Sequence, residues 1–389
     1  METPGCNIVV MGVSCFDGMA SSTRVRNLFA PLVKKNLIVA HNLVYQTDTK
    51  ALTQKEGNSN NINYKVIGFK LGNPFSIFSF WSAGISFLKK SKIKGRKNII
   101  YNYNYPDLKN IAILLFGKMM GYKLVFDIIE DNRFESHVSF INKLRLKTSI
   151  FLFKISRLFT NTYVAISDHL YKRVQEISKG KVPVYLIPIT VNLHYFPANN
   201  YTAPKDLKIF YGGSFGAKDG LEYLVGAFEE VSKVNSTIKL ILTGSGNKQD
   251  LERIQSKINQ SAAKDRVLFM GFLSTEDYYA TLNSCDIFCM TRVNSQFANA
   301  GFPFKLGEFL ASGKGVIATK VGDVANYLND TNSILISPDS VAELTDALLL
   351  LIKDPAKISL LGAGARKTAE TYFDSEQVSS KLLSIFESA

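Results

Sequence analysis

Short apolar runs rich in β-branched and aromatic residues alternate with longer amphipathic stretches, and this alternation limits the folds open to the chain. The predicted strands cover residues 7–12, 37–44, 64–69, 98–101, 123–127 and 162–166, then 208–211, 238–242, 267–270, 287–290, 315–318 and 333–336. Helical spacing fills the intervals, as at 23–34, 108–120, 220–232 and 340–353. Such alternation predicts an α/β protein in which helices cover both faces of parallel sheets.

The number of strands and the chain length indicate two domains. Twelve strands are too many for one doubly wound sheet, and 389 residues exceed the size at which a single core stops growing. We expect an N-terminal Rossmann-like domain over 1–190, a linker over 191–206, a C-terminal Rossmann-like domain over 207–372, and a helix at 373–389 that packs back on the first domain. Because ligands bind at the carboxyl ends of parallel strands, the two sheets are expected to face a central cleft.

The positive charge is confined to the first half of the chain. The net charge is +13, from 46 Lys and Arg against 33 Asp and Glu. Residues 1–200 hold 27 of the basic and 11 of the acidic residues, a net charge of +16, which leaves −3 for residues 201–389. Charge asymmetry of this kind indicates different partners for the two halves. A basic domain suits nucleic acid, an anionic membrane surface or a phosphorylated substrate.

Composition and motifs exclude several classes of protein. The 46% apolar and 20% charged content is typical of globular chains. Cys6, Cys15, Cys285 and Cys289 form no C-x-x-C pair, so we expect buried, reduced thiols and neither a zinc site nor a disulfide framework. The first residues show no basic, apolar leader, and no run of ~18 uncharged apolar residues occurs. A secretory signal and a membrane-spanning helix are therefore not expected.

The first candidate site follows the first strand of the second half. Residues 208–220 lead from that strand through several glycines to Lys218 and a helix that begins near Gly220. Backbone N–H groups in such a turn hold anions, and Lys218 adds a positive charge suited to a diphosphate. Neither of the common phosphate-binding glycine motifs is present. These residues alone also fit an ordinary strand–helix turn with a solvated lysine.

Residues 301–319 form the second candidate site. Pro303 suits the first turn of a helix predicted over 304–311, which leads into a buried strand. Unbonded N–H groups at the start of that helix are expected to point at an anion; they belong to Phe304, Lys305 and Leu306. Glu308, one turn later, is placed to reach a ribose attached to that anion. A surface carboxylate beside a solvated lysine is the alternative interpretation.

The ordered set of segments resembles the retaining glycosyltransferases of family 4, which have the two-Rossmann GT-B fold. Residues 18–26 resemble the family's N-terminal glycine-containing loop, and 163–170 with 184–191 resemble the end of its N-terminal domain. Residues 208–220 resemble the donor-phosphate loop, 242–246 and 267–272 the next strand ends, and 302–319 the most specific stretch of the family. The resemblance covers essentially the whole chain.

The resemblance implies a role for each matching residue. Glu308 corresponds to the second glutamate of the E-x7-E motif, which holds the donor ribose, and Lys218 to a lysine that contacts the donor diphosphate. The implied donor-binding residues are Gly18, Gly213, Ser214, Lys218, Gly244, Gly271, Arg292, Phe304, Lys305, Leu306 and Glu308. The donor is then a UDP or GDP sugar, and no other cofactor is implied.

The sequence departs from the family pattern at two positions. Ala300 stands where the first glutamate of the motif touches the donor sugar, and the adjacent Asn299 is the nearest polar substitute. Ser214 stands where the family often has an arginine, so Lys218 or Arg292 is expected to supply that charge. Ala300 leaves a catalytically impaired family member as an alternative.

A polar cluster at 126–137 follows a predicted strand and resembles the acceptor-side loop of the family. Its candidates for positioning an acceptor hydroxyl are Asp127, Glu130, Asp131 and His137, and helix capping with loop salt bridges is the alternative. Three further histidines show no partner in the sequence and are interpreted as structural: His41, His169 and His194.

The resemblance also implies a mechanism without a protein nucleophile. The departing diphosphate takes up the acceptor proton, so catalysis consists of positioning and of stabilising the leaving group's charge. Helix N-termini and Lys218 supply that charge stabilisation without a metal. The residues predicted to be catalytic are Lys218, Glu308, Asp131 and His137. The expected activity is a retaining, metal-independent transfer of a hexose to an acceptor hydroxyl.

Two basic, aromatic segments of the first half suggest a membrane surface. In residues 75–97, Ile77, Trp81, Ile85 and Leu88 share a helical face that precedes a run of lysines, and residues 144–159 mix aromatic with basic side chains. Such segments suit anionic membranes, although the apolar face can instead pack on its own sheet. We therefore expect a cytoplasmic protein, peripheral at the inner face of the membrane, that acts on a lipid-linked or polysaccharide precursor of a surface glycan.

Two other functions remain as alternatives. A nucleotide-sugar 2-epimerase shares the double-Rossmann architecture but acts on the sugar without an acceptor. A nucleic-acid-binding protein is suggested only by the charge, and no signature of such a protein is present, so no nucleic-acid partner is expected. The sequence leaves the donor base, the sugar and the acceptor open.

Overall fold

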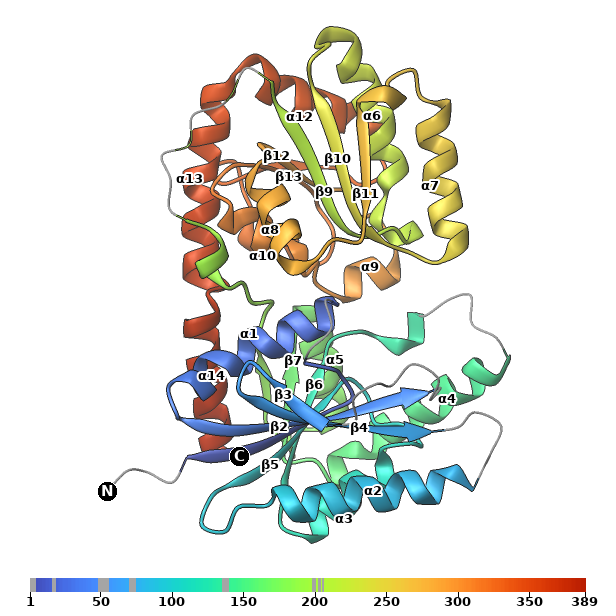
Figure 1. The fold of residues 1–389 in the computed structure, drawn as a ribbon, viewed down its shortest axis with the longest axis vertical. Coiled ribbons are helices and arrows are strands. Elements are labelled where there is room, and N and C mark those ends of the chain that lie inside the picture. Colours follow the sequence, from blue (N-terminus) through green and yellow to red (C-terminus); the bar gives the residue numbers. More distant parts are fainter. Residues whose placement is uncertain are drawn as a thin grey trace. The chain divides into compact units, whose positions relative to one another are not determined.

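The computed structural model describes residues 5–15, 19–47, 56–69, 75–134, 140–197, 201, 204 and 206–389. The chain forms two compact units (Figure 1): unit 1 comprises residues 1–190 and 375–389, and unit 2 comprises residues 191–374. Each unit is a parallel α/β structure, so the predicted fold class is confirmed. The C-terminal helix α14 (Ser375–Ser388) belongs to unit 1 and packs on its first helix.

Unit 1 contains an eight-stranded sheet with the order β3-β4-β2-β1-β5-β6-β7-β8. The strands are β1 (Cys6–Met11), β2 (Ile38–Thr47), β3 (Glu56–Ser59), β4 (Ile62–Phe69), β5 (Asn98–Tyr103), β6 (Lys123–Ile128), β7 (Thr162–Ala165) and β8 (Val184–Leu186). Only β3 runs antiparallel to its neighbour. From β1 the chain adds strands on one side and then, from β5 onward, on the other, so the strand order reverses between β1 and β5.

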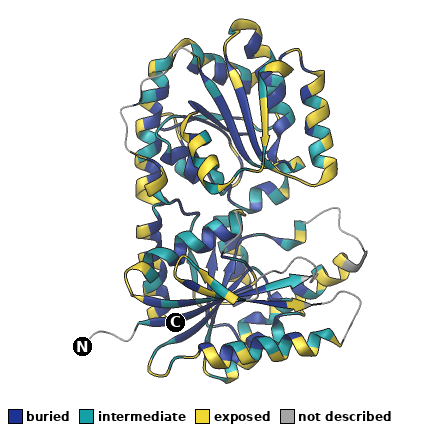
Figure 2. Ribbon diagram, viewed as in Figure 1, coloured by how far each residue is buried: buried dark blue, intermediate teal, exposed yellow. Residues whose placement is uncertain are grey.

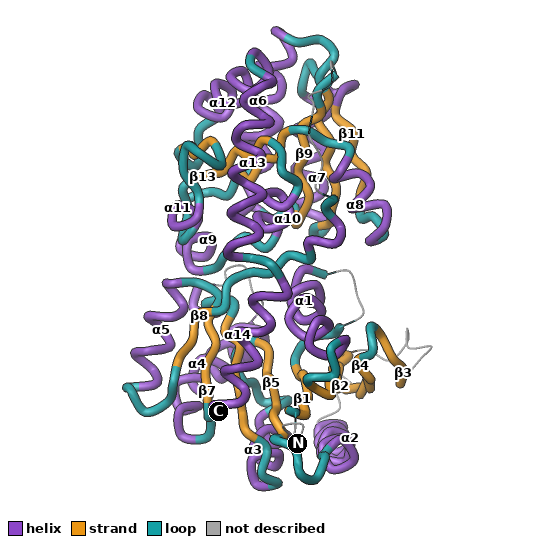
Figure 3. The backbone as a smooth tube through the Cα atoms, turned by 90° about the vertical axis from the view of Figure 1, so that its left-hand side faces the viewer, coloured by secondary structure: helices purple, strands orange, loops and turns teal. Residues whose placement is uncertain are grey.

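Helices cover both faces of this sheet because successive side chains of a strand point to opposite faces. They are α1 (Ala20–Lys34), α2 (Ser76–Ser91), α3 (Ile111–Met119), α4 (Phe140–Ile155), α5 (Asp168–Ser178) and α14. On β5, Ile100 faces α3, because a Cβ at Gly117 of that helix would contact the Ile100 side chain. The following residue of β5, Tyr101, contacts Phe29 of α1 and Phe386 of α14. Figure 3 shows the helices flanking the strands.

Unit 2 has a six-stranded parallel sheet with the order β11-β10-β9-β12-β13-β14. The strands are β9 (Lys208–Ser214), β10 (Lys239–Ser245), β11 (Val267–Gly271), β12 (Ile287–Met290), β13 (Gly315–Thr319) and β14 (Ile334–Ile336). The helices are α6 (Leu221–Val234), α7 (Lys248–Gln260), α8 (Thr275–Asn283), α9 (Gln296–Ala300), α10 (Lys305–Ala311), α11 (Val324–Tyr327), α12 (Val341–Lys353) and α13 (Pro355–Tyr372). This is the dinucleotide-binding strand order, in which the direction of strand addition reverses between β9 and β12.

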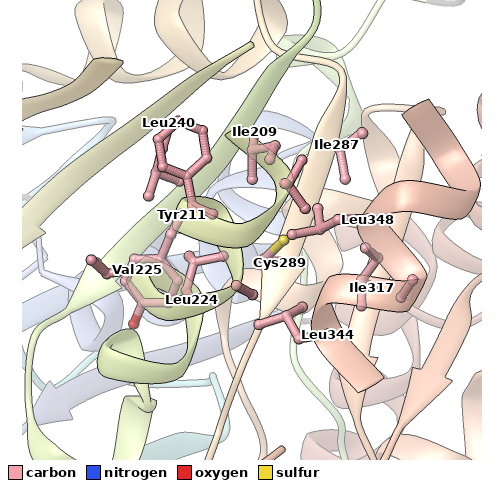
Figure 4. Packing of buried hydrophobic residues seen from close by; sticks show 14 of the residues in the cluster. Ile209, Tyr211, Leu224, Val225, Leu240, Ile287, Cys289, Ile317, Leu344 and Leu348 are labelled. Carbon is pink, nitrogen blue, oxygen red and sulfur yellow. The ribbon is translucent and has the colours of Figure 1, made fainter. Parts of the chain in front are cut away.

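The core of unit 2 follows the same alternation of side chains. Ile209 and Tyr211 of β9 point toward α6 and α12, where they pack with Leu224 and Leu348 (Figure 4). Phe210, between them, contacts Phe309 of α10 on the other face. Buried residues therefore follow the strands in both units (Figure 2). All four cysteines are buried thiols, as predicted.

All twelve predicted strands form, with ends that differ by a few residues. Within the described ranges, β3 and β8 are additional strands. The polar residues of β3 carry no apolar alternation, and the strand pairs with β4 through a hairpin at Asn60 and Asn61, whose φ angles of 52° and 61° suit a tight turn. β8 has only three residues, too few to show a period.

Candidate functional site

The carboxyl ends of β9 and β12 form the centre of the candidate donor site. β9 pairs with β12 only through Ile209 and Phe210, but it pairs with β10 as far as Ser214. The ends of β9 and β12 therefore separate at the point where the strand order reverses. Ligands of open α/β sheets bind at such a point.

The loop that follows β9 is fixed against the end of β12. The Ser214 hydroxyl donates to the buried Asp219 carboxylate over 2.5 Å, and the Asp219 carbonyl accepts from Thr291 over 2.8 Å. Gly220 has a φ of 64°, and a Cβ there would overlap the Thr291 carbonyl oxygen. These contacts hold Lys218 on a rigid turn, with its Nζ 5.1 Å from the centre of the Phe297 ring.

Glycines stand at three neighbouring strand ends of the same edge. Gly244 adopts a φ of 140°, and a side chain there would overlap the Gly213 carbonyl oxygen, so the ends of β9 and β10 approach more closely than other residues allow. Gly271 at the end of β11 has a φ of 64° and accepts a 2.8 Å hydrogen bond from Thr243. The structure therefore brings Gly213, Gly244 and Gly271 to one edge of the sheet.

Arg292 follows β12 and supplies a buried positive charge at this edge. The residue is 9% exposed, and its Nη1 donates to the Ala298 carbonyl over 3.4 Å. Its Nε is buried and has no hydrogen-bond partner among the residues that the structure describes. A buried donor without a partner is costly, and a bound anion would satisfy it.

Glu308 of α10 is 5% exposed and lies in a cluster of hydrogen-bond donors. It accepts hydrogen bonds from Tyr278 over 2.8 Å and from Tyr279 over 3.1 Å, and it forms an ion pair with Lys305, whose Nζ lies 3.1 Å from its Oε2. A carboxylate has about four acceptor positions, so a further donor, such as a ribose hydroxyl, can still bind. Burial, and then Glu308, raise the pKa of Tyr278 well above its usual range, which keeps this hydroxyl a donor.

The predicted N–H donors at the start of α10 are only partly available. The helix begins at Lys305, one residue later than predicted, and the Leu306 N–H donates to the Pro303 carbonyl over 3.0 Å. The prediction that Leu306 offers this N–H to an anion is therefore wrong, because the preceding turn already uses it. Within the described ranges, the N–H groups of Phe304 and Lys305 donate to no other residue.

Neither Ala300, at the position of the first motif glutamate, nor the adjacent Asn299 offers a free polar side chain for the donor sugar. Ala300 is fully buried in α9. The side chain of Asn299 accepts from the Gly322 N–H over 2.9 Å and donates to Asn294 over 2.8 Å. Asn299 therefore connects neighbouring loops. The sequence suggests Asn299 as a sugar contact, but these two partners cannot be identified from the sequence alone.

In unit 1, the buried Asp131 is the centre of an ionic cluster whose partners are partly exposed. Its carboxylate accepts three hydrogen bonds from the Arg133 side chain, the shortest being 2.6 Å, and one from the Arg133 backbone N–H, and its Oδ2 lies 3.3 Å from His169 Nε2. His169, interpreted as structural from the sequence, thus gains an acidic partner from a neighbouring strand end. Gly18 and His137 lie outside the described residues, and Glu130 is half-buried. Asp127 is bound by Arg24 inside the unit, so it supports the fold rather than an acceptor.

Replacing Asp131 with Asn is expected to destabilise unit 1 by about 1–3 kcal/mol at pH 7. Burial opposes the charge of Asp131, but hydrogen bonds from Arg133 and His169 outweigh burial and lower its pKa. A lowered pKa means that the stabilisation is complete above the unfolded value, ~3.9, and is lost as the pH falls through the folded value. The difference in free energy of unfolding between wild type and Asp131→Asn should therefore become smaller below about pH 4.

Urea unfolding followed by the fluorescence of the single tryptophan, Trp81 in α2, measures this effect in unit 1. Glu176→Gln is the matched control, because its carboxylate is 68% exposed in its pair with Arg173, and an exposed pair contributes little. Equal stability of Asp131→Asn and wild type at pH 7 would contradict the prediction.

The two segments predicted to face a membrane are partly buried. Leu88 and Phe153 are buried, and Ile77, Trp81 and Ile85 are half-buried against unit 1. The exposed apolar side chains of the two segments are Phe75, Phe78, Leu144, Phe151 and Leu158. No helix in the described ranges is long and apolar enough to cross a bilayer. Those ranges also contain no cluster of three or more His, Cys, Asp or Glu suited to a metal ion.

Comparison with known proteins finds a family similarity within unit 2. Residues 206–354 match the family model described as glycosyl transferases group 1. A GDP-mannose-dependent monoacylated α-(1-6)-phosphatidylinositol monomannoside mannosyltransferase of Corynebacterium glutamicum is 26% identical over 44% of each chain. A 2-deoxystreptamine glucosyltransferase of Streptomyces kanamyceticus is 25% identical over 42% of this chain and 41% of its own. The alignments thus span less than half of these relatives.

Solved structures resemble the whole chain. Sucrose-phosphate synthase from Thermosynechococcus elongatus superposes with a TM-score of 0.76 and 17% identity, over 98% of both chains. The Anabaena protein HepE in complex with UDP superposes with a TM-score of 0.72 and 15% identity, over 99% of this chain and 100% of its own. At these identities the similarity establishes the GT-B fold. The similarity in sequence is to the glycosyl transferases group 1 and covers residues 206–354.

Proposed function

We propose that the protein transfers a sugar from a nucleotide-diphosphate sugar to an acceptor hydroxyl, and that unit 2 binds the donor. The observation that carries the proposal is the buried, incompletely bonded Arg292 beside the rigid Lys218 turn, where the strand order reverses. Similar proteins support a nucleotide-sugar donor, since one is GDP-mannose-dependent and HepE structures contain UDP or UDP-glucose.

The residues of this site suit the departure of a diphosphate. Lys218 and Arg292 would neutralise its charge, and the N–H groups of Phe304 and Lys305 would bind its oxygens, while Glu308 binds the ribose. The bond from the sugar's anomeric carbon to the diphosphate oxygen breaks, the acceptor oxygen bonds to that carbon, and the acceptor proton passes to the departing diphosphate. Fixed charges aimed at the leaving group supply the stabilisation. The proposed transfer retains the anomeric configuration and uses no metal.

The acceptor in this proposal is a lipid-linked or polysaccharide precursor of a surface glycan. Unit 1 carries the positive charge of the chain, and Phe75, Phe78, Phe151 and Leu158 are exposed on its helices and turns. Exposed apolar side chains surrounded by Lys and Arg favour the surface of an anionic membrane. The protein would then act at the inner face of the cell membrane.

Nucleotide binding tests the donor site directly. UDP or GDP at about 100 times its dissociation constant should raise the melting temperature by ~5 °C or more, with EDTA present. Arg292→Ala and Lys218→Ala should each weaken binding about tenfold, because each removes a charge that contacts the diphosphate. Lys248→Ala is the control, since that lysine is 88% exposed on α7.

The outcomes of this experiment separate the alternatives. Binding that is unchanged in both Arg292→Ala and Lys218→Ala would remove these residues from the phosphate site. Binding that requires a divalent ion would contradict the metal-free mechanism. An epimer formed from the donor alone would identify a nucleotide-sugar 2-epimerase instead.

A further inference from the structure

Unit 1 contains a pocket of about 460 Å³ that none of the predicted site residues lines. Its floor consists of Gly12, which follows β1, Tyr45 of β2, and Tyr103 at the end of β5. These residues lie at carboxyl strand ends, where the strand order of this sheet reverses between β1 and β5. Gly12 has a φ of 85°, and a Cβ there would lie 2.9 Å from the Tyr103 carbonyl oxygen. The pocket thus occupies the position at which open α/β sheets bind ligands.

One face of α4 forms a wall of the pocket. The lining residues Asn142, Arg145, Leu146 and Ser149 follow the spacing of a single helical face. Ser149 donates to the Pro106 carbonyl over 2.8 Å and thereby fixes α4 to the loop that follows β5.

The loop that follows β5 also lines the pocket and is held by its own side chains. Asn110 donates to Asn102 over 2.9 Å, and Asn102 donates to the Asn104 carbonyl over 2.9 Å. Asp107 Oδ1 accepts from the N–H groups of Lys109 and Asn110, each over 2.9 Å. A site whose walls are fixed before a ligand arrives loses less entropy on binding.

The uncharged lining residues suit a sugar or another polyol. Tyr45, Tyr103 and Tyr105 present aromatic rings, and Asn104 and Asn132 present amides. The hydroxyl groups of Tyr45 and Tyr103 are buried and have no hydrogen-bond partner in the described part of the chain, and Tyr103 is only 7% exposed. Burial, and then Asp107, raise the pKa of Tyr45 well above its usual range, so this hydroxyl stays protonated.

The charged lining residues suit an anion. Burial lowers the pKa of Lys109, and the nearby Arg145 lowers it further. Two cations therefore lie close together at one pocket. Asp107 also lines the pocket, but it binds two backbone N–H groups and partly offsets this charge.

We propose that this pocket binds the anionic part of the acceptor: a sugar or polyol that carries a phosphate or a carboxylate, either in solution or as a lipid headgroup. The tyrosines and asparagines bind the hydroxyl groups, and Arg145 with Lys109 binds the anion. This inference rests on the proposed function and adds the chemistry of the acceptor group that unit 1 binds.

Calorimetric titration of the full chain with glucose 6-phosphate, glucose and inorganic phosphate tests the proposal. Glucose 6-phosphate should bind more tightly than either of the other two. Arg145→Ala should weaken its binding about tenfold, and Tyr103→Phe about threefold. Lys143→Ala is the matched control, because Lys143 is an exposed cation of the same helix that does not line the pocket; it should change binding less than twofold.

A lipid source is distinguished by co-sedimentation with phosphatidylinositol vesicles and with neutral phosphatidylcholine vesicles. The anion is assigned to a lipid headgroup if the protein sediments with phosphatidylinositol vesicles but not with phosphatidylcholine vesicles, and if Arg145→Ala, but not Lys143→Ala, reduces this binding. If neither glucose 6-phosphate nor phosphatidylinositol binds, or if Arg145→Ala and Lys143→Ala behave alike, the proposal is overturned. UDP and GDP titrations of the same preparation separate this failure from failure of the proposed function, because the donor residues lie in unit 2.

Discussion

Replacing Glu308 with Gln should weaken the binding of UDP or GDP, whichever nucleotide the protein prefers, by about 10- to 100-fold. The buried carboxylate already binds Tyr278, Tyr279 and Lys305, and its remaining acceptor position is the one available to a ribose hydroxyl. A hydrogen bond to a charged group contributes roughly 1.5–3 kcal/mol, and 1.36 kcal/mol corresponds to a factor of ten. Calorimetric titration of wild type and variant with the nucleotide measures the loss.

The Glu308→Gln substitution could also weaken binding by loosening α10, and titration with deoxynucleotides separates this effect from loss of ribose contact. Wild type should bind the nucleotide more tightly than its 2′-deoxy or 3′-deoxy analogue, whichever analogue lacks the hydroxyl that Glu308 contacts. Glu308→Gln should bind the nucleotide and that analogue with similar affinity. Coupling between the side chain and that hydroxyl is the signature of direct contact. Tyr279→Phe is the structural control, since it removes one donor to Glu308 and leaves the carboxylate in place. If removal of either ribose hydroxyl lowers the affinity of wild type and of Glu308→Gln by the same factor, Glu308 does not contact the ribose.

The sequence predicts the helices and strands of the donor site better than the side-chain contacts between them. Strand periodicity places β12 at Ile287–Met290 as found, and the structure brings Gly213, Gly244 and Gly271, which the resemblance implies as donor-binding residues, to one edge of the sheet. Glu308 and Tyr278 are 30 positions apart, and only the packing of α8 against α10 brings them together. The adjacent tyrosines at 278 and 279 are a signal that could have been noticed, but nothing local gives them a partner.

The same limit applies to unit 1. The cluster at 126–137 correctly directs attention to a strand end, but Asp131 binds Arg133 and His169, and Asp127 binds Arg24. The pocket lies at the neighbouring strand end, after β5, where Tyr and Asn alternate at 101–105. Alternation of buried polar and aromatic residues resembles an ordinary strand, so only the packing of α4 reveals the pocket.

Removal of the Arg24 side chain should cause a large loss of stability in unit 1, about 3–5 kcal/mol for Arg24→Ala. Arg24 of α1 and Asp127 of β6 have fully buried side chains and form two hydrogen bonds, of 2.9 and 3.0 Å. Burial opposes the charge of Arg24, but Asp127 outweighs burial and raises the pKa of the guanidinium above its usual range. Without Arg24, the carboxylate remains inside the unit with no counter-charge from this residue.

Arg24 also connects α1 to the segment after β8. It donates to the carbonyl oxygens of Ile187 over 3.0 Å and of Pro188 over 2.6 Å. The double variant Arg24→Met with Asp127→Leu should therefore recover only part of the loss: it removes the unpaired charge, but these two carbonyls still lack their donor. A full recovery would show that the charge pair alone accounts for the effect.

Urea unfolding monitored by Trp81 reports on unit 1, because Trp81 is the single tryptophan of the chain and its indole N–H donates to the Lys109 carbonyl within that unit. A shift of the midpoint without a change of slope gives the free-energy difference. Lys35→Ala is the control for loss of a cation, since its pair with Glu376 lies on the surface of unit 1 and contributes little. If Arg24→Ala lowers stability no more than Lys35→Ala, the buried pair does not determine the stability of unit 1.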